Sequence, residues 1–430
     1  MNDVRLKAVM DAFSSYTEFS NEEYVSEDML RSADTPAPVL EKIYERNKNN
    51  VNVLRGLAMN ANCPSGLLAS LSGNENDAVR WGVADNSNTS AETLERLAGD
   101  ANDVIRYRVA MNPNAKGKTL RHLAQSGNPL VRSGAAANPS SPQDILEELS
   151  KDADVTVRIE TAKNKGTPKE TLERMAMMAD ERIRLAVAEN ENTAPVTLKR
   201  LARDSFVEVR AAAAANPGMP QSELVALSLD EKPEVRNGVA RNANTPTVTL
   251  TGLSKDTKQI VLSSVAAHPH TNEAVLALLS EDEDAYVRKE VARNPSTPKD
   301  VLLRLSGDPD WKVCEGVAEN PNAPEDALTA LAGSSDTYIR KAVAHNPGAP
   351  ERVLAGLSGD AEWLVRENAA KNPSASVDTL MKLKKDRNWA VAKQIADNPN
   401  MTTESLEELA KDSNYRMRYK ARVVLLKRDE

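Results

Sequence analysis

A repeat period of 26 residues, free of insertions and deletions, constrains the fold of this chain more than any other feature. Steps of 26 residues from Asn60 reach fourteen positions, of which thirteen are Asn and one is His268. We call these positions anchors and describe every other residue by its offset from the anchor of its repeat. Self-similarity at a period of about 20 to 50 residues is typical of solenoids, in which each repeat buries its apolar face against its neighbours.

Aliphatic residues recur at fixed offsets within the repeat. Offset 8 is Leu in all fourteen repeats, offset 11 is Leu in thirteen and Met175 in the other, and offset 19 is always Val, Ile or Met. Leu at offsets 8 and 11 lies on one face of a short helix, and apolar residues at offsets 19, 23 and 24 form the stripe of a second helix. The pattern therefore predicts an all-α solenoid of about fourteen two-helix repeats.

Polar residues and prolines indicate where these helices begin and end. Pro occupies offset 4 in eight repeats, often after Ser or Thr, which predicts a Ser/Thr N-cap followed by Pro at the first helical position. Asp occupies offset 14 in ten repeats, where we expect the N-cap of the second helix. Pro follows the anchor in nine repeats, and the anchor Asn is expected to end that helix in the left-handed conformation.

The regular repeats predict three parts of the chain. Residues 60–423 form the solenoid, and residues 424–430 form a short C-terminal tail. Residues 1–59 form an N-terminal helical cap with a degenerate repeat, although a separate functional module is an alternative for this part. The degenerate repeat is indicated by Leu40, Ile43, Val53, Leu54 and Ala58. The cap is indicated by four aromatic residues, Phe13, Tyr16, Phe19 and Tyr24.

The repeat resembles the leucine-rich repeat variant family. The consensus N-P-x-T-P-x-x-x-L-x-x-L-[SA]-x-D-x-x-x-x-V-R-x-x-V-A is nearly complete in residues 294–318 and 346–370. The resemblance implies a right-handed superhelix of alternating α-helices and short 3₁₀-helices without β-strands. Some members of the family carry an N-terminal cysteine cluster that holds an iron–sulfur centre. Only Cys63 and Cys314 are present here, so we expect no such cofactor.

An arginine recurs at offset 20 in eleven repeats and predicts a ladder of side chains along the solenoid. We interpret this ladder as structural, because a guanidinium can pair with the Asp at offset 14 or with carbonyls at helix ends. Contacts with the phosphates of a nucleic acid are the alternative. The ladder consists of Arg80, Arg106, Arg132, Arg158, Arg184, Arg210, Arg236, Arg288, Arg340, Arg366 and Arg418, and it is interrupted at Leu262, Cys314 and Ala392.

Aromatic residues recur near the start of the second helix in six successive C-terminal repeats. We expect them at an edge of the superhelix, where aromatic rings are enriched in recognition sites. The alternative is that they pack on one another as structural spacers. The row consists of Tyr286, Trp311, Tyr338, Trp363, Trp389 and Tyr415.

No arrangement of residues predicts catalysis or a cofactor. The acidic residues occupy repeated capping positions, no phosphate-binding glycine loop occurs, and the four histidines lack metal-ligand spacing except for His268 and His270 as a weak H-x-H. His268 is more simply explained as a replacement of an anchor Asn. We therefore expect no metal site, no cofactor and no enzyme; an active site within residues 1–59 would be the third hypothesis, and no motif supports it.

Charge and hydropathy bear on the partner and the compartment. The net charge is −8 and neither half is basic, which disfavours a nucleic-acid clamp. No apolar run reaches the length of a membrane-spanning helix, about 20 residues, and the N-terminus lacks a signal-peptide core, so we expect a cytoplasmic protein and no membrane partner. The leading hypothesis is a non-enzymatic scaffold that binds another protein along an extended surface. The alternative is a nucleic-acid-binding helical-repeat protein that uses the arginine ladder.

Overall fold

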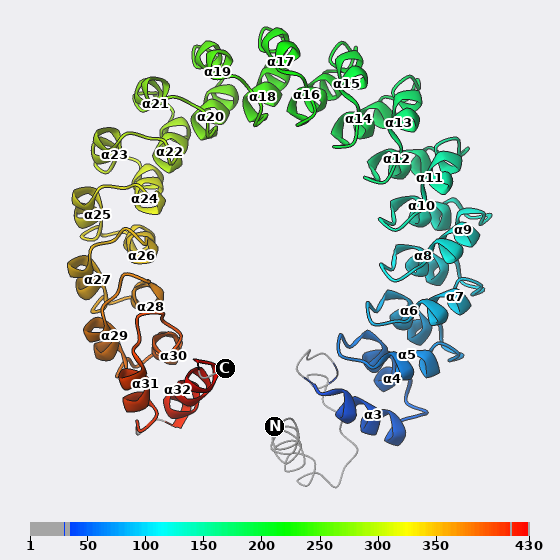
Figure 1. Cartoon of the computed structure of the whole chain (residues 1–430), viewed down its shortest axis with the longest axis horizontal. Helices are drawn as coiled ribbons and strands as arrows, with labels where there is room; N and C mark the ends of the chain where they lie inside the picture. The colour runs from blue at the N-terminus through cyan, green and yellow to red at the C-terminus, as the bar shows by residue number, and fades with distance from the viewer. Residues whose placement is uncertain (1–29, 31–34, 413–414, 429–430) are drawn as a thin grey trace. The chain divides into compact units, whose positions relative to one another are not determined.

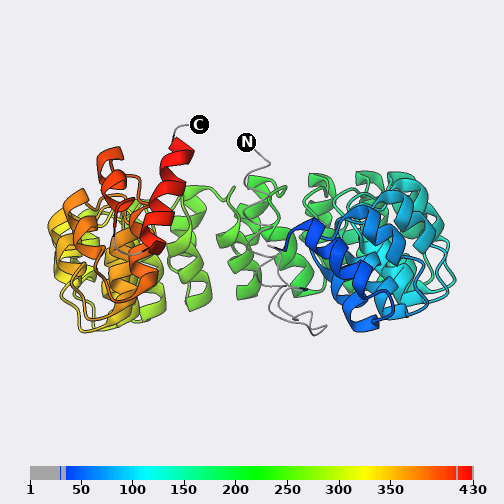
Figure 2. The ribbon, with the colours of Figure 1, turned by 90° about the horizontal axis from the view of Figure 1, so that it is seen from below.

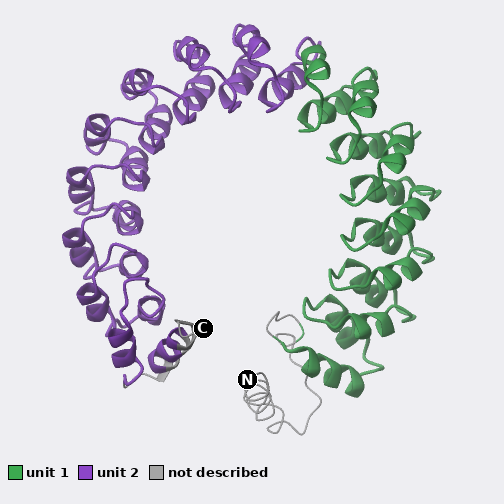
Figure 3. Ribbon diagram, viewed as in Figure 1, with its two compact units in different colours: residues 1–201 green, residues 202–430 purple. Residues whose placement is uncertain are grey.

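The computed structural model describes residues 30, 35–412 and 415–428, and α-helices are the only regular elements in that part of the chain. It divides into two compact units, Met1–Leu201 and Ala202–Glu430 (Figure 3). In each unit every complete repeat contributes two helices, and Figure 1 shows the two kinds in two separate rows. We call them the shorter and the longer helix, because the second is longer in every complete repeat except 372–397, where both have seven residues. The predicted all-α solenoid is confirmed. The right-handed sense of the superhelix stays a prediction.

The shorter helices cover offsets 5 to 11, so the Leu residues at offsets 8 and 11 lie on them. In the N-terminal unit they are α5 (Ser65–Leu71), α7 (Ala91–Leu97), α9 (Gly117–Ala124), α11 (Gln143–Leu149), α13 (Lys169–Met175) and α15 (Pro195–Leu201). In the C-terminal unit they are α17 (Gln221–Leu227), α19 (Thr247–Leu253), α21 (Glu273–Leu279), α23 (Lys299–Leu305), α25 (Glu325–Leu331), α27 (Glu351–Leu357), α29 (Val377–Leu383) and α31 (Thr403–Leu409).

The longer helices begin at offset 17, and all but the last two end just before the next anchor. In the N-terminal unit they are α6 (Asp77–Asp85), α8 (Asp103–Met111), α10 (Pro129–Ala137), α12 (Val155–Lys163) and α14 (Glu181–Glu189). In the C-terminal unit they are α16 (Val207–Ala215), α18 (Pro233–Arg241), α20 (Gln259–Ala267), α22 (Ala285–Arg293), α24 (Trp311–Glu319), α26 (Thr337–His345), α28 (Trp363–Lys371), α30 (Trp389–Ile395) and α32 (Tyr415–Arg428). They are α-helical, whereas the resemblance implied short 3₁₀-helices.

Within each unit, the core consists of aliphatic side chains stacked from successive repeats. The Leu side chains at offset 8 are completely buried in all fourteen repeats, from Leu68 to Leu406. The residues at offset 19, such as Val79 and Val287, are also buried. Longer helices of neighbouring repeats pack directly on one another, and Figure 2 shows their axes running across the direction of stacking. The predicted buried stripes are therefore confirmed.

The predicted start of the shorter helices is wrong by one residue. Pro142 and Pro168 stand at the N-cap itself, with extended backbone and no side-chain capping bond. The Thr before the proline does not cap the helix either. Its hydroxyl donates backward to the preceding longer helix, as Thr167 Oγ1 does to the Thr161 carbonyl at 2.6 Å. Each Thr of this kind therefore joins the two helices that flank the anchor.

The predicted N-cap of the longer helices is wrong by two residues. The N-cap is at offset 16, where Asn102 Oδ1 accepts the Val104 N–H at 2.9 Å. The Asp at offset 14 instead accepts the N–H of the capping residue, as Asp100 Oδ1 does from Asn102 at 2.9 Å. This Asp therefore shapes the turn before the helix and keeps a second oxygen for another donor.

The anchor asparagines have extended backbone, so the prediction of a left-handed conformation is wrong. Asn112 has φ −69° and ψ 130°, and no non-glycine residue of the described chain has a positive φ. The side chain explains the recurrence of Asn. Asn112 Nδ2 donates to the carbonyls of Ala84 and Asn86 in the preceding repeat at 2.8 and 2.9 Å, and its Oδ1 accepts the Asn114 N–H at 2.9 Å. We call this pair of donated bonds the anchor clamp.

Both ends of the chain depart from the regular repeat. Helices α3 (Ala37–Arg46) and α4 (Val51–Met59) correspond to the degenerate repeat, and its five aliphatic residues are buried. The predicted aromatic cap, Phe13, Tyr16, Phe19 and Tyr24, lies outside the described residues. At the other end α32 continues to Arg428, through most of the segment expected to be a tail. Among the described helices, none combines the length and the apolar character needed to cross a membrane.

Candidate functional site

Four residues of the aromatic row lie at the surface of the longer helices in the C-terminal unit. Tyr286, Trp311, Tyr338 and Trp363 are 57%, 44%, 61% and 38% exposed. They stand at the first or second residue of α22, α24, α26 and α28, which are successive helices of the same row in Figure 1. We call these four residues the aromatic surface.

Helix geometry explains why these large side chains remain exposed. The buried residue at offset 19, Val313 in α24, lies two positions after Trp311. Two positions turn a side chain by about 200° around an α-helix, so a ring at offset 17 lies away from the core. Tyr286 and Tyr338, at offset 18, lie about 100° from the buried residue and are still mostly exposed.

Lysines accompany the rings of the aromatic surface. Lys289 Nζ lies 5.4 Å from the centre of the Tyr286 ring, and Lys312 Nζ lies 5.8 Å from that of Trp311, both within cation–π range. The rings of Trp311 and Tyr338 are 6.4 Å apart and tilted by 35°. The surface thus combines apolar rings with ammonium groups, and one pair of its rings is in contact across neighbouring repeats.

The two remaining aromatic residues of the row differ from these four. Trp389, at the start of α30, is half-buried and packs against the core formed by the C-terminal repeats. Tyr415 begins α32, and its side chain lies outside the described residues. We therefore leave both out of the aromatic surface.

Seven arginines of the ladder bridge neighbouring repeats. Each Nε lies 2.6 to 2.9 Å from the Asp at offset 14 of the following repeat, and these arginine side chains are only 14% to 18% exposed. The pairs are Arg80–Asp100, Arg132–Asp152, Arg210–Asp230, Arg236–Asp256, Arg288–Asp308, Arg340–Asp360 and Arg366–Asp386. We call them the arginine bridges.

Arg340 shows how fully the guanidinium is used in a bridge. Its Nε and Nη2 donate to both carboxylate oxygens of Asp360 at 2.7 and 3.0 Å, and its Nη1 donates to the carbonyls of Ser334 and Ser335 at 2.9 and 3.0 Å. These hydrogen bonds hold the pKa of Asp360 below its usual value. The same contacts leave little of the guanidinium for a phosphate.

Each of the other four arginines of the ladder also has contacts within its own repeat. Arg106 pairs with Asp103, three residues earlier, and Nη1 of Arg158 donates to the Asp152 and Ala153 carbonyls at 2.5 and 3.0 Å. Arg184 Nη1 donates to the Met178 and Ala179 carbonyls, and Arg418 Nη1 donates to the Asp412 carbonyl. Carbonyls of the turn between the two helices, at offsets 14 and 15, are therefore common acceptors even where the offset-14 residue, such as Met178, is not Asp.

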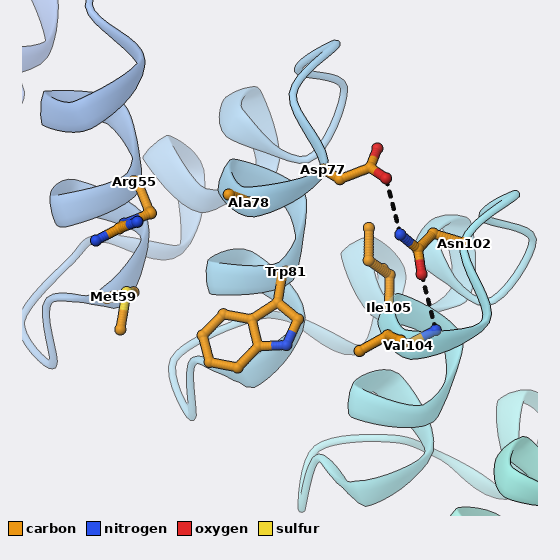
Figure 4. Close-up of a pocket in the computed structure, with 8 residues that line it drawn as sticks. All are labelled: Arg55, Met59, Asp77, Ala78, Trp81, Asn102, Val104 and Ile105. Carbon is orange, nitrogen blue, oxygen red and sulfur yellow. Dashed lines mark hydrogen bonds between the residues drawn. The ribbon is translucent and has the colours of Figure 1, made fainter.

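A groove in the N-terminal unit brings together residues that the sequence pattern did not single out. It encloses about 400 Å³ and is lined by Arg55, Met59, Asp77, Ala78, Trp81, Asn102, Val104 and Ile105, from α4, α6 and α8 (Figure 4). Trp81 occupies offset 21, one helical turn after offset 17, and so lies on the same helix face as the later tryptophans. Because offsets 17 and 21 lie on the same helix face, this spacing could have identified Trp81 from the sequence.

Among the described residues, some charged side chains around this groove have ion-pair or hydrogen-bond partners, and one does not. Asp77 accepts from Asn102 Nδ2 and from Arg80 Nη2, both at 2.7 Å, and the first of these bonds is drawn in Figure 4. Arg108 lies 4.9 Å from the Trp81 ring centre and pairs with Asp85 at 3.2 Å. Arg55 forms no ion pair with any described residue. The open charge at this apolar groove is therefore cationic.

The described residues offer no arrangement for metal or thiol chemistry. That part of the chain has no group of three His, Cys, Asp or Glu side chains that could hold a metal ion. Cys63 and Cys314 are free and buried, and burial raises the pKa of Cys63 to about 12. The Sγ of Cys314 lies 3.3 Å from the Asp308 carbonyl, the type of acceptor that an arginine uses in other repeats.

Comparisons with known proteins agree with the repeat pattern. The model of the family described as "Leucine rich repeat variant" matches residues 286–310, which confirms the resemblance. A solved leucine-rich repeat variant structure is 26% identical in sequence. The match covers 51% of this chain and 87% of that chain, with a TM-score of 0.37. The structure of yeast importin-β (Kap95p) is 12% identical in sequence. That match covers 94% of this chain and 63% of that chain, with a TM-score of 0.38. No curated protein matches the chain.

Proposed function

We propose that this chain, whose repeats match the leucine-rich repeat variant family, is a non-enzymatic scaffold that binds another protein through the aromatic surface. The single observation that carries the proposal is the exposure of Tyr286, Trp311, Tyr338 and Trp363 in four successive repeats. Exposed rings of this size are enriched at the energetic centres of protein interfaces, because they provide a large contact area at a low cost in conformational entropy.

The arginine ladder has a different role in this proposal. Seven of its members bridge repeats with side chains at most 18% exposed, and this geometry favours a structural role over phosphate binding. Nucleic-acid binding remains the alternative function. It would require these arginines to release Asp oxygens and carbonyls that they already hold.

The groove at Trp81 is a second candidate contact of the same scaffold, located in the N-terminal unit. Its lining is mostly apolar, with Met59 52% and Val104 47% exposed. Because Arg55 is its open charge, we expect the groove to receive a large apolar side chain of the partner next to an acidic residue. It would add contact area without changing the class of partner.

The test is capture of partners from a lysate of the native host by the purified full-length chain. We predict that Trp311→Ala with Trp363→Ala lowers the recovery of a specific partner at least tenfold, which corresponds to a loss of about 1.4 kcal/mol or more. Because both rings are well exposed, the thermal midpoint should change by only a few degrees. Phe206→Ala, which removes a 43% exposed ring outside the aromatic surface, is the matched control.

Nuclease treatment and salt separate the two functions. A protein partner held by the aromatic surface should survive nuclease and bind with little dependence on salt, whereas affinity for a nucleic acid falls steeply as salt rises. Equal recovery of the partner by the double variant and the wild type would contradict the proposal. So would binding that is lost after nuclease treatment.

A further inference from the structure

One boundary between repeats in the C-terminal unit lacks half of the anchor clamp. On either side of it the clamp is complete: Asn242 donates to the Ala214 and Asn216 carbonyls, both at 2.7 Å, and Asn294 donates to the Ala266 and His268 carbonyls at 2.6 and 3.0 Å. At the boundary between residues 242–267 and 268–293 the anchor is His268. Its Nε2 lies 3.0 Å from the Asn242 carbonyl, and among the described contacts it makes no bond to the Ala240 carbonyl.

The same boundary also lacks an arginine bridge. Leu262 occupies the arginine position and is buried, so the carboxylate at offset 14 of the next repeat, Asp282, has no arginine partner among the described residues. Asp282 Oδ1 still accepts the Asp284 N–H at 2.9 Å, as in the other turns. The polar contacts between these two repeats are therefore reduced at two separate places.

Other boundaries without a bridge keep the full clamp. Cys314 replaces arginine in the repeat that begins at Asn294, but Asn320 still donates to the Ala292 and Asn294 carbonyls at 2.7 and 2.9 Å. Ala392 replaces it near the C-terminus, and Asn398 still donates to Ala370 and Asn372 at 2.8 and 2.9 Å. The loss of one kind of contact is common in this chain, whereas His268 marks a place where both are affected.

The hydrogen bonds of His268 require a neutral ring. Its Nδ1 accepts the backbone N–H of His270 at 3.0 Å, so its Nε2 must carry the proton that is donated to Asn242. A second proton on Nδ1 would point at the His270 N–H and abolish that bond. Unlike Asn, His at this position can therefore lose a contact when the solution becomes acidic.

We propose that the boundary between residues 242–267 and 268–293 is a pH-sensitive weak point of the stack, where protonation of His268 loosens α21 and α22 from α18 and α20. The inference rests on the reduced clamp, the missing bridge and the acceptor role of Nδ1. Tyr286 lies on α22, so one end of the aromatic surface would loosen with it. That consequence for a partner rests on the proposed function, whereas the weak point itself does not.

The surroundings of His268 determine whether the boundary becomes less or more stable as the pH falls. Burial lowers its pKa, the Asn242 carbonyl opposes this, and charge repulsion between the imidazoles of His268 and His270, whose ring centres are 5.3 Å apart, lowers it further. Among the described residues packed around it, from α18, α20, α21 and α22, no carboxylate acts on its charge. Because the folded pKa is below the unfolded value of about 6.5, the stabilisation is complete above that pH and is lost as the pH falls below it.

The experiment is hydrogen exchange of the full-length chain, followed by mass spectrometry at about pH 7.5 and pH 5.5 and corrected for intrinsic exchange rates. We expect peptides from α20, α21 and α22 to exchange at least about threefold faster at the lower pH, and peptides from α24 to α28 to change less. Equal acceleration in both regions would overturn the proposal.

Two variants that restore a missing contact, and one control variant, complete the test. His268→Asn should restore both donated bonds of the clamp and remove the acid-induced acceleration. Leu262→Arg should slow exchange about equally at both pH values by bridging to Asp282, and the pH dependence should remain. His345→Asn, which replaces an exposed histidine at the end of α26, should leave the acceleration at α20 to α22 unchanged. Acid-induced acceleration that persists undiminished in folded His268→Asn, or that disappears in His345→Asn, would overturn the proposal.

Discussion

At the scale of single residues, the anchor Asn provides three hydrogen bonds that few other side chains can make together. Its amide nitrogen donates to two carbonyls of the preceding repeat, and its amide oxygen accepts an N–H of its own turn. All of these atoms are buried: Asn112 is 3% exposed. Buried backbone groups without a partner are costly, which explains why the same residue type recurs at nearly every anchor.

Substitutions at Asn112 should show the two parts of this role. Asn112→Ala removes both donors and the acceptor, so we expect a loss of about 2 to 4 kcal/mol in the free energy of unfolding. Asn112→Asp keeps the acceptor but places a buried carboxylate against two carbonyls, and should destabilise more. The measurement is the denaturant midpoint, with exposed Asn52→Ala as the control that should change it little. An Asp variant as stable as wild type would contradict the clamp.

The sequence predicted the burial of individual aliphatic residues better than the roles of polar ones. Leu at offset 8 and Val at offset 19 follow from helical periodicity alone, because a helix places them on one face whatever its neighbours are. The clamp made by Asn112 and the backward bond of Thr167 depend on carbonyls brought close by packing or by the turn itself. The anchor Asn was therefore correctly identified as a recurring position, but its expected left-handed backbone was the wrong reason for the recurrence.

At the scale of helices, the longer helices approach so closely that some positions have no room for a side chain. A Cβ added at Gly238 of α18 would lie 2.5 Å from the Ala211 carbonyl oxygen of α16, and one at Gly82 would lie 2.9 Å from the Ala58 Cβ. Both glycines occupy offset 22 of their repeats. Ala residues at offsets 23 and 24 contribute to the same close packing, since they fill little space.

Two glycine substitutions should have opposite effects on stability. Gly238→Ala must push α18 away from a backbone atom, and we expect it to lower the free energy of unfolding by about 1 to 3 kcal/mol. Gly252→Ala in α19 meets nothing within 4 Å and should raise it by about 0.5 to 1 kcal/mol, because Ala favours the helix. Thermal midpoints of the two variants provide the test. A stabilised Gly238→Ala variant would show that α16 and α18 are not in such close contact.

Helix boundaries were harder to predict than the helices themselves. The pattern predicted two helices in each repeat, but it placed the N-cap of the longer one at offset 14 instead of 16. Asp and Asn favour both a cap and the turn that precedes it, so residue type alone did not distinguish Asp100 from Asn102. The distinction comes from Arg80, which draws Asp100 toward the neighbouring repeat.

At the scale of the whole molecule, the two units share one set of contacts between repeats. Arginine bridges occur in both of them, such as Arg80–Asp100 in the N-terminal unit and Arg340–Asp360 in the C-terminal unit. His268 replaces an anchor only in the C-terminal unit. The candidate surfaces differ as well, since the apolar groove at Trp81 and the aromatic surface lie in different units.

The aromatic surface could be predicted from the sequence, whereas the groove could not. Six aromatic residues at nearly the same offset predicted a row, and four of them have exposed side chains. Trp389 departs from the row because it packs against the core near the end of the stack, which depends on the neighbouring repeats. The groove at Trp81 depends on three helices and has no repeated motif, so only the coordinates bring its residues together.

The arginine bridges predict how the whole stack responds to acid. Hydrogen bonds from arginine hold the pKa values of Asp360 and Asp386 below their usual value, and both carboxylates are at most 8% exposed. For a lowered carboxylate pKa, the stabilisation is present above the unfolded value of about 3.9 and is lost as the pH falls through the folded value. Asp152 in the N-terminal unit also has a lowered pKa, so both units should lose stability below about pH 4. The loss proposed for His268, which sets in below about pH 6.5, would concern the C-terminal unit alone.

The substitution Asp360→Asn tests how much a single arginine bridge contributes to the free energy of unfolding. At neutral pH we expect the variant to be about 1 to 3 kcal/mol less stable than wild type, because Arg340 loses its charged partner in a largely buried site. As the pH falls through the lowered pKa of Asp360, the wild-type carboxylate also becomes neutral, so the two stabilities should converge. Denaturant midpoints measured from about pH 2.5 to pH 7 test this. A difference that stays constant over the whole range would mean that Asp360 contributes through the shape of its turn and not through its charge.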